Sequence, residues 1–114
     1  MVIVGDVTGK LCIIIDDIAD TCRTLTSASK LLTLKGATRI VAFITHGILS
    51  GNSLQHLQDS DIDEVIVSNS VAQGSNMKKC SKVKVMDITP IFAEAIRRIH
   101  NGESVSFLFE SVPY

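Results

Sequence analysis

Apolar and polar positions alternate along the chain in two different periods. Three continuous apolar runs, at residues 11–15, 39–45 and 64–68, predict strands that are covered on both faces, as in a parallel sheet. Residues 82–86 alternate between lysines and apolar side chains, which predicts a strand with one wetter face. A last strand is expected at residues 105–109.

Between these runs, the apolar residues recur at helical spacing. Such a pattern over residues 24–35 predicts a helix. A short helix should follow Asn52 or Ser53, either of which can cap it. A third helix should be capped by Thr89, with a proline at its first position, and should stop near Asn101.

The order of these elements predicts the fold class. Strands and helices alternate, with one long polar loop expected at residues 69–79. Repeated strand–helix units imply a parallel sheet with helices on both faces. With 114 residues, one domain over residues 1–114 is the natural organisation. We therefore expect an α/β fold.

Composition excludes several classes of protein. Apolar residues make up 46% of the chain, and 11 basic residues nearly balance 12 acidic ones, unlike a disordered chain or a strongly basic nucleic-acid binder. The longest apolar run is too short to span a membrane, and the N-terminus lacks a signal-peptide pattern. Cys12, Cys22 and Cys80 are odd in number and lack CxxC spacing, so we expect a reducing, cytoplasmic setting without a disulfide framework or a zinc site.

One segment, residues 16–24 (DDIADTCRT), concentrates the candidate chemistry. It connects the end of a predicted buried strand to the start of a helix, which is where ligands bind in open α/β sheets. Asp16 and Asp17 are hydrogen-bond acceptors, suited to sugar hydroxyls or a hydrated metal ion. The following residues would present backbone N–H groups and two hydroxyls at a helix N-terminus, which suits phosphate. The pattern predicts a sugar-phosphate site, although ordinary helix capping accounts for it equally well.

The same segment resembles the signature of type I phosphoribosyltransferases. DDIADTCRTL is similar to the DDMADTCGTL form of ribose-phosphate diphosphokinases. The resemblance extends over nearly the whole chain, through VGDV, KGATRIVAFITHGILSG and AEAIRRIHNGESVSFLF. It implies a phosphoribosyltransferase-like fold, incomplete at its N-terminus, that forms the C-terminal domain of such an enzyme.

The family transfers the diphosphate of ATP to ribose 5-phosphate with magnesium, and its members form homo-oligomers. The resemblance implies that Asp16 and Asp17 face the ribose hydroxyls. It implies that the 5-phosphate is surrounded by the residues of the following loop, which are Asp20, Thr21, Cys22, Arg23 and Thr24. The ATP-binding loop and most magnesium ligands would lie in an N-terminal half outside this chain, which leaves no catalytic residue or metal ligand to assign here.

Two further residues correspond, by the same resemblance, to a regulatory site for phosphate or ADP. They are Ser104 and Ser106, near the end of the chain. The helix N-terminus could also lower the pKa of the Cys22 thiol. No paired base lies within sequence reach, so we expect no nucleophilic chemistry from this cysteine.

Arg23 departs from the family pattern, which has glycine at that position. A side chain there should cost phosphate binding if the backbone must adopt a positive φ or touch the ligand. A guanidinium that folds onto the phosphate would act in the opposite direction. We expect the steric cost to dominate, so that Arg23→Gly would strengthen ribose 5-phosphate binding.

Three functions remain as hypotheses at this point. The first is the C-terminal part of a ribose-phosphate diphosphokinase, inactive by itself. The second is a non-catalytic regulatory or associated subunit that binds a full-length synthase. The third, a salvage phosphoribosyltransferase, would need a base-recognition segment for which the sequence has no spare residues.

Overall fold

The protein is described by a computed structural model, which covers residues 1–111. Its centre is a four-stranded parallel sheet in the order β1-β2-β3-β4. The strands are β1 (Leu11–Ala19), β2 (Arg39–Gly47), β3 (Glu64–Ser68) and β4 (Val83–Met86). The predicted α/β class and parallel sheet are confirmed, and β1 and β2 run farther than the apolar runs suggested.

Four helices and one short 3-10 helix accompany the sheet. They are α1 (Arg23–Leu34), α2 (Ser53–Asp59), α3 (Asn76–Lys79), α4 (Thr89–His100) and η1 (Ser106–Phe109). The helix predicted at 24–35 is thus confirmed to within one residue. Within residues 1–111, no helix combines the length and apolar character that crossing a membrane requires.

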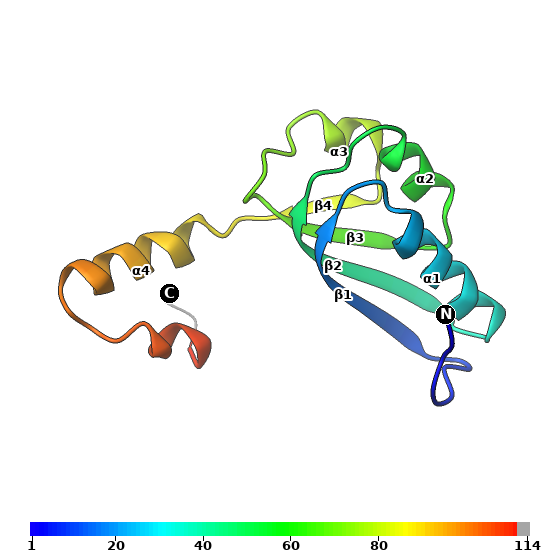
Figure 1. Cartoon of the computed structure of the whole chain (residues 1–114), viewed down its shortest axis with the longest axis horizontal. Helices are drawn as coiled ribbons and strands as arrows, with labels where there is room; N and C mark the ends of the chain where they lie inside the picture. The colour runs from blue at the N-terminus through cyan, green and yellow to red at the C-terminus, as the bar shows by residue number, and fades with distance from the viewer. Residues whose placement is uncertain (112–114) are drawn as a thin grey trace.

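The core lies on one face of the sheet, between the strands and helices α1, α2 and α3 (Figure 1). Alternate residues of β2, Ile40, Ala42 and Ile44, point into it, as alternation along a strand requires. Leu25 of α1 and Leu57 of α2 are buried against them. The helices therefore fix the position of the loops at the carboxyl ends of the strands.

The opposite face of the sheet has no helix over it, so the expectation of helices on both faces was wrong for the described residues. Ile13 is 56% exposed, Ile15 82% and Phe43 36%. The physical reason lies after β4, where the chain leaves the sheet and α4 extends away from it instead of folding back (Figure 1). The continuous apolar runs of β1 and β2 thus predicted two buried faces, of which this chain covers one.

Helix α4 and η1 form a projecting arm with its own local contacts (Figure 1). The Arg97 guanidinium bonds both Glu94 and Glu103, at 2.6 and 2.7 Å, and Arg98 bonds Glu94 at 2.9 Å. The Arg98 guanidinium also lies 4.5 Å from the centre of the Phe107 ring. These contacts hold η1 against the end of α4, whereas no residue of α4 is buried.

Three local predictions were wrong for identifiable reasons. The segment 105–109 forms a 3-10 turn, because it lies in the arm with no strand beside it to pair with. The last four residues of the predicted loop at 69–79 form α3. Thr89 does not cap α4 but is its first residue, because the helix starts one position earlier with Ile88 at the N-cap, and Asp87 accepts the Thr89 N–H at 2.9 Å.

Gly47, at the end of β2, provides a test of this packing. A Cβ there would lie 2.6 Å from Cγ2 of Val67 and 3.0 Å from Nε2 of Gln73. We expect Gly47→Ala to lower the free energy of unfolding by about 1–3 kcal/mol, the usual cost of overpacking. The matched control is Gly74→Ala, because a Cβ there would meet nothing within 4 Å. Urea denaturation measures both, and equal midpoints for the two variants would contradict the packing described.

Candidate functional site

The loop between β1 and α1 lies where the carboxyl ends of the parallel strands meet. Strand β1 continues through Asp16 and Asp17 to Ala19, so the two aspartates lie within the strand and not after it. Three residues then lead directly into α1, which begins at Arg23. The turn is tight because Cys22 adopts a left-handed conformation with φ of 65°.

This backbone geometry removes one of the two parts of the steric argument against Arg23. The positive φ falls on Cys22, and Arg23 is the first residue of the helix with ordinary helical conformation. A side chain at position 23 therefore carries no backbone strain of the kind expected for a non-glycine residue at positive φ. The expected gain in binding from Arg23→Gly then rests only on a close approach of the backbone to the ligand.

The loop is fixed from the side by the segment that follows β2. Ile48 and Leu49 both donate their backbone N–H to the carbonyl of Ala19, at 2.9 and 3.2 Å. The carboxylate of Asp20 accepts the backbone N–H of Ser50 at 3.3 Å and also its hydroxyl. The Asp20 carboxylate therefore holds the loop to the segment that follows β2.

The start of α1 opens into a cavity of about 220 Å³. No side chain caps the helix, so its first N–H groups lack the partner that a capping residue would supply. The cavity is lined by Asp16, by Ile18 and Ala19, and by the loop and first helical residues from Asp20 to Leu25. Free N–H groups and the positive end of the helix dipole make this cavity suitable for an anion.

The two aspartates differ in their relation to the cavity. Asp16 lines it, whereas Asp17 does not, because neighbouring residues of a strand point to opposite faces. Asp16 accepts the N–H of Asp17 at 2.8 Å, and Asp17 accepts the N–H of Ile18 at 2.9 Å. The interaction with the Asp16 side chain, and then the hydrogen bond that the Ile18 N–H donates, hold the pKa of Asp17 below its usual range.

An exposed acidic acceptor beside an uncapped helix N-terminus can accommodate a sugar phosphate. Comparison with known proteins identifies the family of the chain. The family described as the phosphoribosyl synthetase-associated domain matches residues 1–110. This chain belongs to that family.

Two relatives place this family membership in context. Ribose-phosphate pyrophosphokinase 3 of Saccharomyces cerevisiae is 49% identical over 113 residues, which are 99% of this chain and 35% of that protein. The crystal structure of phosphoribosylpyrophosphate synthetase from Mycobacterium smegmatis matches 87% of this chain at a TM-score of 0.82 and 37% identity. The match covers 33% of that structure, so the chain spans about a third of the length of both relatives.

The other predicted residues of this phosphoribosyl synthetase-associated domain are not all brought together. Thr21, Cys22, Arg23 and Thr24 all line the cavity at the start of α1, and their contact with a phosphate stays a prediction. Ser104 and Ser106 instead lie in the arm, beyond α4 (Figure 1). There, the Ser104 hydroxyl accepts the Ser106 N–H at 3.2 Å, and the Ser104 carbonyl accepts a hydrogen bond from Arg98 at 3.0 Å.

Three residues near the loop were not predicted to contribute to it. Ser50 holds Asp20, and His56 of α2 places its Nδ1 3.5 Å from the Thr21 carbonyl. The signal that could have found Ser50 is its place just after β2, the strand that pairs with β1. The third is His46 of β2, whose Nδ1 lies 2.7 Å from the Ser70 hydroxyl at the same edge of the sheet.

The part of the chain that the structure describes offers few side chains that could bind a metal ion. Residues 1–111 contain no group of three or more histidine, cysteine or acidic side chains that could together hold a metal ion. Mg²⁺ is commonly held by one or two carboxylates together with waters and the phosphates of a substrate. The exposed carboxylate of Asp16, which lines the cavity, fits such a shared arrangement and no more than that.

Cys22 does not have the reactive thiol that its place before a helix suggested. Burial, then the charge of Asp20, and then Cys80, raise the pKa of the Cys22 thiol to about 11. We expect iodoacetamide at pH 8 to leave Cys22 and buried Cys80 unmodified in the native protein, because only about one thiol in a thousand is ionised that far below such a pKa. Half-buried Cys12 should react first.

Mass spectrometry of peptides from the alkylated protein would follow each cysteine separately. The control is the same reaction in guanidinium chloride, where all three thiols should react at similar rates. Native labelling of Cys22 faster than Cys12 would show that the helix end dominates over burial.

Proposed function

We propose that this domain is the ribose 5-phosphate-binding part of a ribose-phosphate diphosphokinase, and that it corresponds over residues 1–114 to the C-terminal domain of such enzymes. The observation that carries the proposal is the uncapped N-terminus of α1, which opens into a cavity with Asp16 at its side. The names of the two relatives, a ribose-phosphate pyrophosphokinase and a phosphoribosylpyrophosphate synthetase, support the same substrate class.

The loop would hold the 5-phosphate mainly through its backbone. The N–H groups at the start of α1 have no capping side chain to compete with a ligand. The hydroxyls of Thr21 and Thr24 belong to exposed residues that line the cavity, and they can donate to phosphate oxygens. A dianionic group at this end of the helix also gains from the helix dipole.

The ribose would extend from the phosphate toward the end of β1. Asp16 lines the cavity, and its carboxylate is not bound to Ser50 as that of Asp20 is, so it is the first candidate to accept hydrogen bonds from the ribose hydroxyls. Asp17 lies next to it with its pKa lowered, and so it stays charged at neutral pH. The Asp16 carboxylate could hold a hydrated Mg²⁺ together with oxygen atoms of the ligand.

Transfer of diphosphate from ATP would need parts that this domain does not contribute. A reaction of this kind depends on cationic groups and metal ions around the nucleotide. In our proposal the ATP-binding loop and most magnesium ligands belong to the other two thirds of the enzyme. We therefore propose binding without turnover for this chain alone.

Calorimetry with ribose 5-phosphate tests the site. We expect Asp16→Asn to weaken binding about tenfold, since each lost hydrogen bond to a charged group is worth roughly 1.5–3 kcal/mol before exposure reduces it. Asp17→Asn is the matched control, with the same change of charge outside the cavity, and it should weaken binding less. Thr24→Ala should also weaken binding.

The same samples, given ATP and magnesium, should release no AMP. Equal losses in Asp16→Asn and Asp17→Asn would contradict the assignment of the sugar to the cavity. Steady AMP release at ordinary enzymatic rates would contradict the proposal that the domain is inactive alone.

A non-catalytic associated subunit is the second candidate function. It is favoured by the apolar side chains left open on the sheet and along the arm, among them Ile15, Phe43 and Ile96. Such surfaces mark association sites or aggregation liabilities. We propose that they bind further copies of this chain or a full-length synthase, and that Ser104 and Ser106 serve a regulatory phosphate or ADP site in that assembly.

The cellular setting is part of the same proposal. Cys12, Cys22 and Cys80 are all free thiols, which fits a reducing compartment such as the cytoplasm.

Self-association can be measured by light scattering coupled to size exclusion. We expect the purified chain to be dimeric or larger, because Ile15 is 82% exposed on the open face of the sheet. Ile15→Lys should shift the population toward monomer. Leu34→Lys is the control, since Leu34 is similarly exposed at 74% but ends α1 and lies off that face. A wild-type chain that stays monomeric at high concentration would contradict association through this face.

A further inference from the structure

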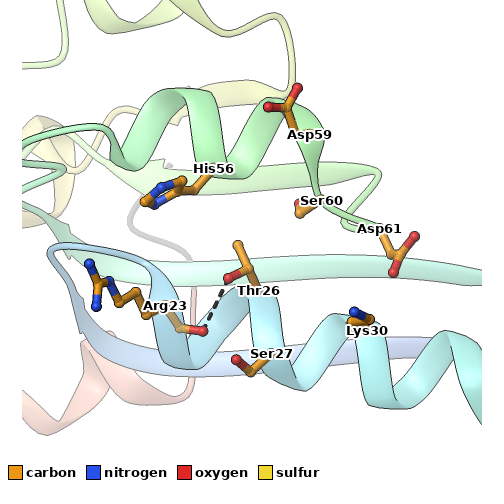
Figure 2. A pocket seen from close by; sticks show the side chains of 8 residues that line it. All are labelled: Arg23, Thr26, Ser27, Lys30, His56, Asp59, Ser60 and Asp61. Carbon is orange, nitrogen blue, oxygen red and sulfur yellow. Dashed lines mark hydrogen bonds between the residues drawn. The ribbon is translucent and has the colours of Figure 1, made fainter.

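A second and larger cavity, of about 640 Å³, lies between α1 and the end of α2 (Figure 2). It adjoins the loop between β1 and α1, residues 20–22, which we call the phosphate loop because we propose that it binds the 5-phosphate. One wall is a single face of α1, which presents Arg23, Thr26 and Lys30 at helical spacing. The other wall includes His56 of α2 and Asp61. Its volume is typical of a small-molecule site, and we refer to it as the α1–α2 groove.

Arg23 belongs to both cavities. It lines the smaller one at the helix N-terminus and also the α1–α2 groove. Within residues 1–111 its guanidinium forms no ion pair, whereas Arg39, Arg97 and Arg98 each pair with a glutamate. An unpaired guanidinium between two cavities is available to a ligand that enters both.

The charged side chains of the α1–α2 groove differ between its two ends. Arg23 and His56 lie at the end next to the loop between β1 and α1 (Figure 2). The Nδ1 of His56 lies 3.5 Å from the Thr21 carbonyl. Asp59 and Asp61 lie toward the other end together with the cation Lys30 (Figure 2). The end that adjoins the loop therefore presents Arg23 without an acidic groove residue, whereas the other end has carboxylates beside its cation.

We propose that Arg23 and His56 form a second anion subsite that continues the phosphate loop, so that the two together hold a diphosphate. One phosphate would occupy the N-terminus of α1, and the next would lie against the Arg23 guanidinium and the His56 ring. This inference rests on the proposed function for the first phosphate only. The ligand class is a diphosphate, either inorganic or esterified at the 5-position of a ribose.

The chemistry of the two residues suits that ligand. A guanidinium donates two parallel hydrogen bonds to phosphate oxygens, and an imidazole donates one through whichever nitrogen carries a proton. The Ser27 hydroxyl on α1 can donate to a further phosphate oxygen, whereas the Thr26 hydroxyl donates to the Arg23 carbonyl at 3.1 Å. Asp59 and Asp61, at the far end, would accept hydrogen bonds from a sugar or base carried by an esterified diphosphate.

Isothermal titration at low salt with orthophosphate, inorganic diphosphate and a nucleoside 5′-diphosphate tests the subsite. We expect the wild-type domain to bind inorganic diphosphate about tenfold more tightly than orthophosphate, a difference of about 1.4 kcal/mol. In Arg23→Gln this ratio should fall toward one, and in His56→Gln it should fall in part. Arg39→Gln is the matched control, because it removes the same charge from an arginine outside the groove and should keep the ratio.

The outcomes separate the two proposals. Equal affinity for the two anions in the wild type, or an equal loss of the ratio in Arg39→Gln, would overturn the subsite. If diphosphate binds in a way that depends on Arg23 while orthophosphate does not bind, the subsite is supported and the proposal that the loop binds the 5-phosphate is overturned. Failure of both anions to bind would overturn both. Tighter binding of the nucleoside 5′-diphosphate than of inorganic diphosphate would identify the esterified ligand as the source.

Discussion

The junction between β1 and α1 depends on hydrogen bonds from the segment after β2. Ile48 and Leu49 donate to the Ala19 carbonyl, and Ser50 donates to the Asp20 carboxylate. These bonds fix the tight turn in which Cys22 adopts its positive φ. With the turn fixed, the helix begins without a capping side chain, and its N-terminus faces a cavity. The candidate site therefore depends on the pairing of β1 with β2, which places the two segments side by side.

The uneven cover of the sheet is the second constraint. Residues of β2 that face the helices, such as Ile40 and Ala42, are fully or almost fully buried. Phe43, which points to the opposite face of the sheet, is 36% exposed. The candidate site lies on the covered face, at the start of α1. Burial on that face alone is therefore sufficient to order the strands and loops that form the site. The other face stays open, and in our proposal it is the surface for association. Binding and assembly would thus use opposite faces of one sheet.

Much of the fold could be predicted because periodicity reports burial directly. The strand at 64–68 and the helix near 24–35 matched the structure within one residue. The segment 105–109 could not be predicted, because β-favouring residues form a strand only beside a partner, and the arm provides none. The exposure of helix α4 could not be predicted either, because an apolar stripe along a helix does not specify which surface the helix will contact.

The candidate site was predictable in its position and less so in its geometry. The pattern of acidic residues, threonines and a following helix located the loop, and the cavity confirms that these residues gather there. Which residue adopts the positive φ was not predictable from residue type. The geometry of the turn decides it, and the positive φ occurs at Cys22 and not at Arg23. The role of Asp20 depended on a contact with Ser50, which is 30 residues away in the sequence.

The central claim is that the N-terminus of α1 binds the phosphate of a sugar phosphate. Titration of the ¹⁵N-labelled chain with ribose 5-phosphate, followed by the amide signals in two-dimensional NMR, tests it most directly. The account predicts that the largest shifts occur at the amides of residues 21–25, with smaller ones at Ser50 and Asp16. Shifts confined to the arm, or no shifts at ligand concentrations that saturate ordinary phosphate sites, would contradict it.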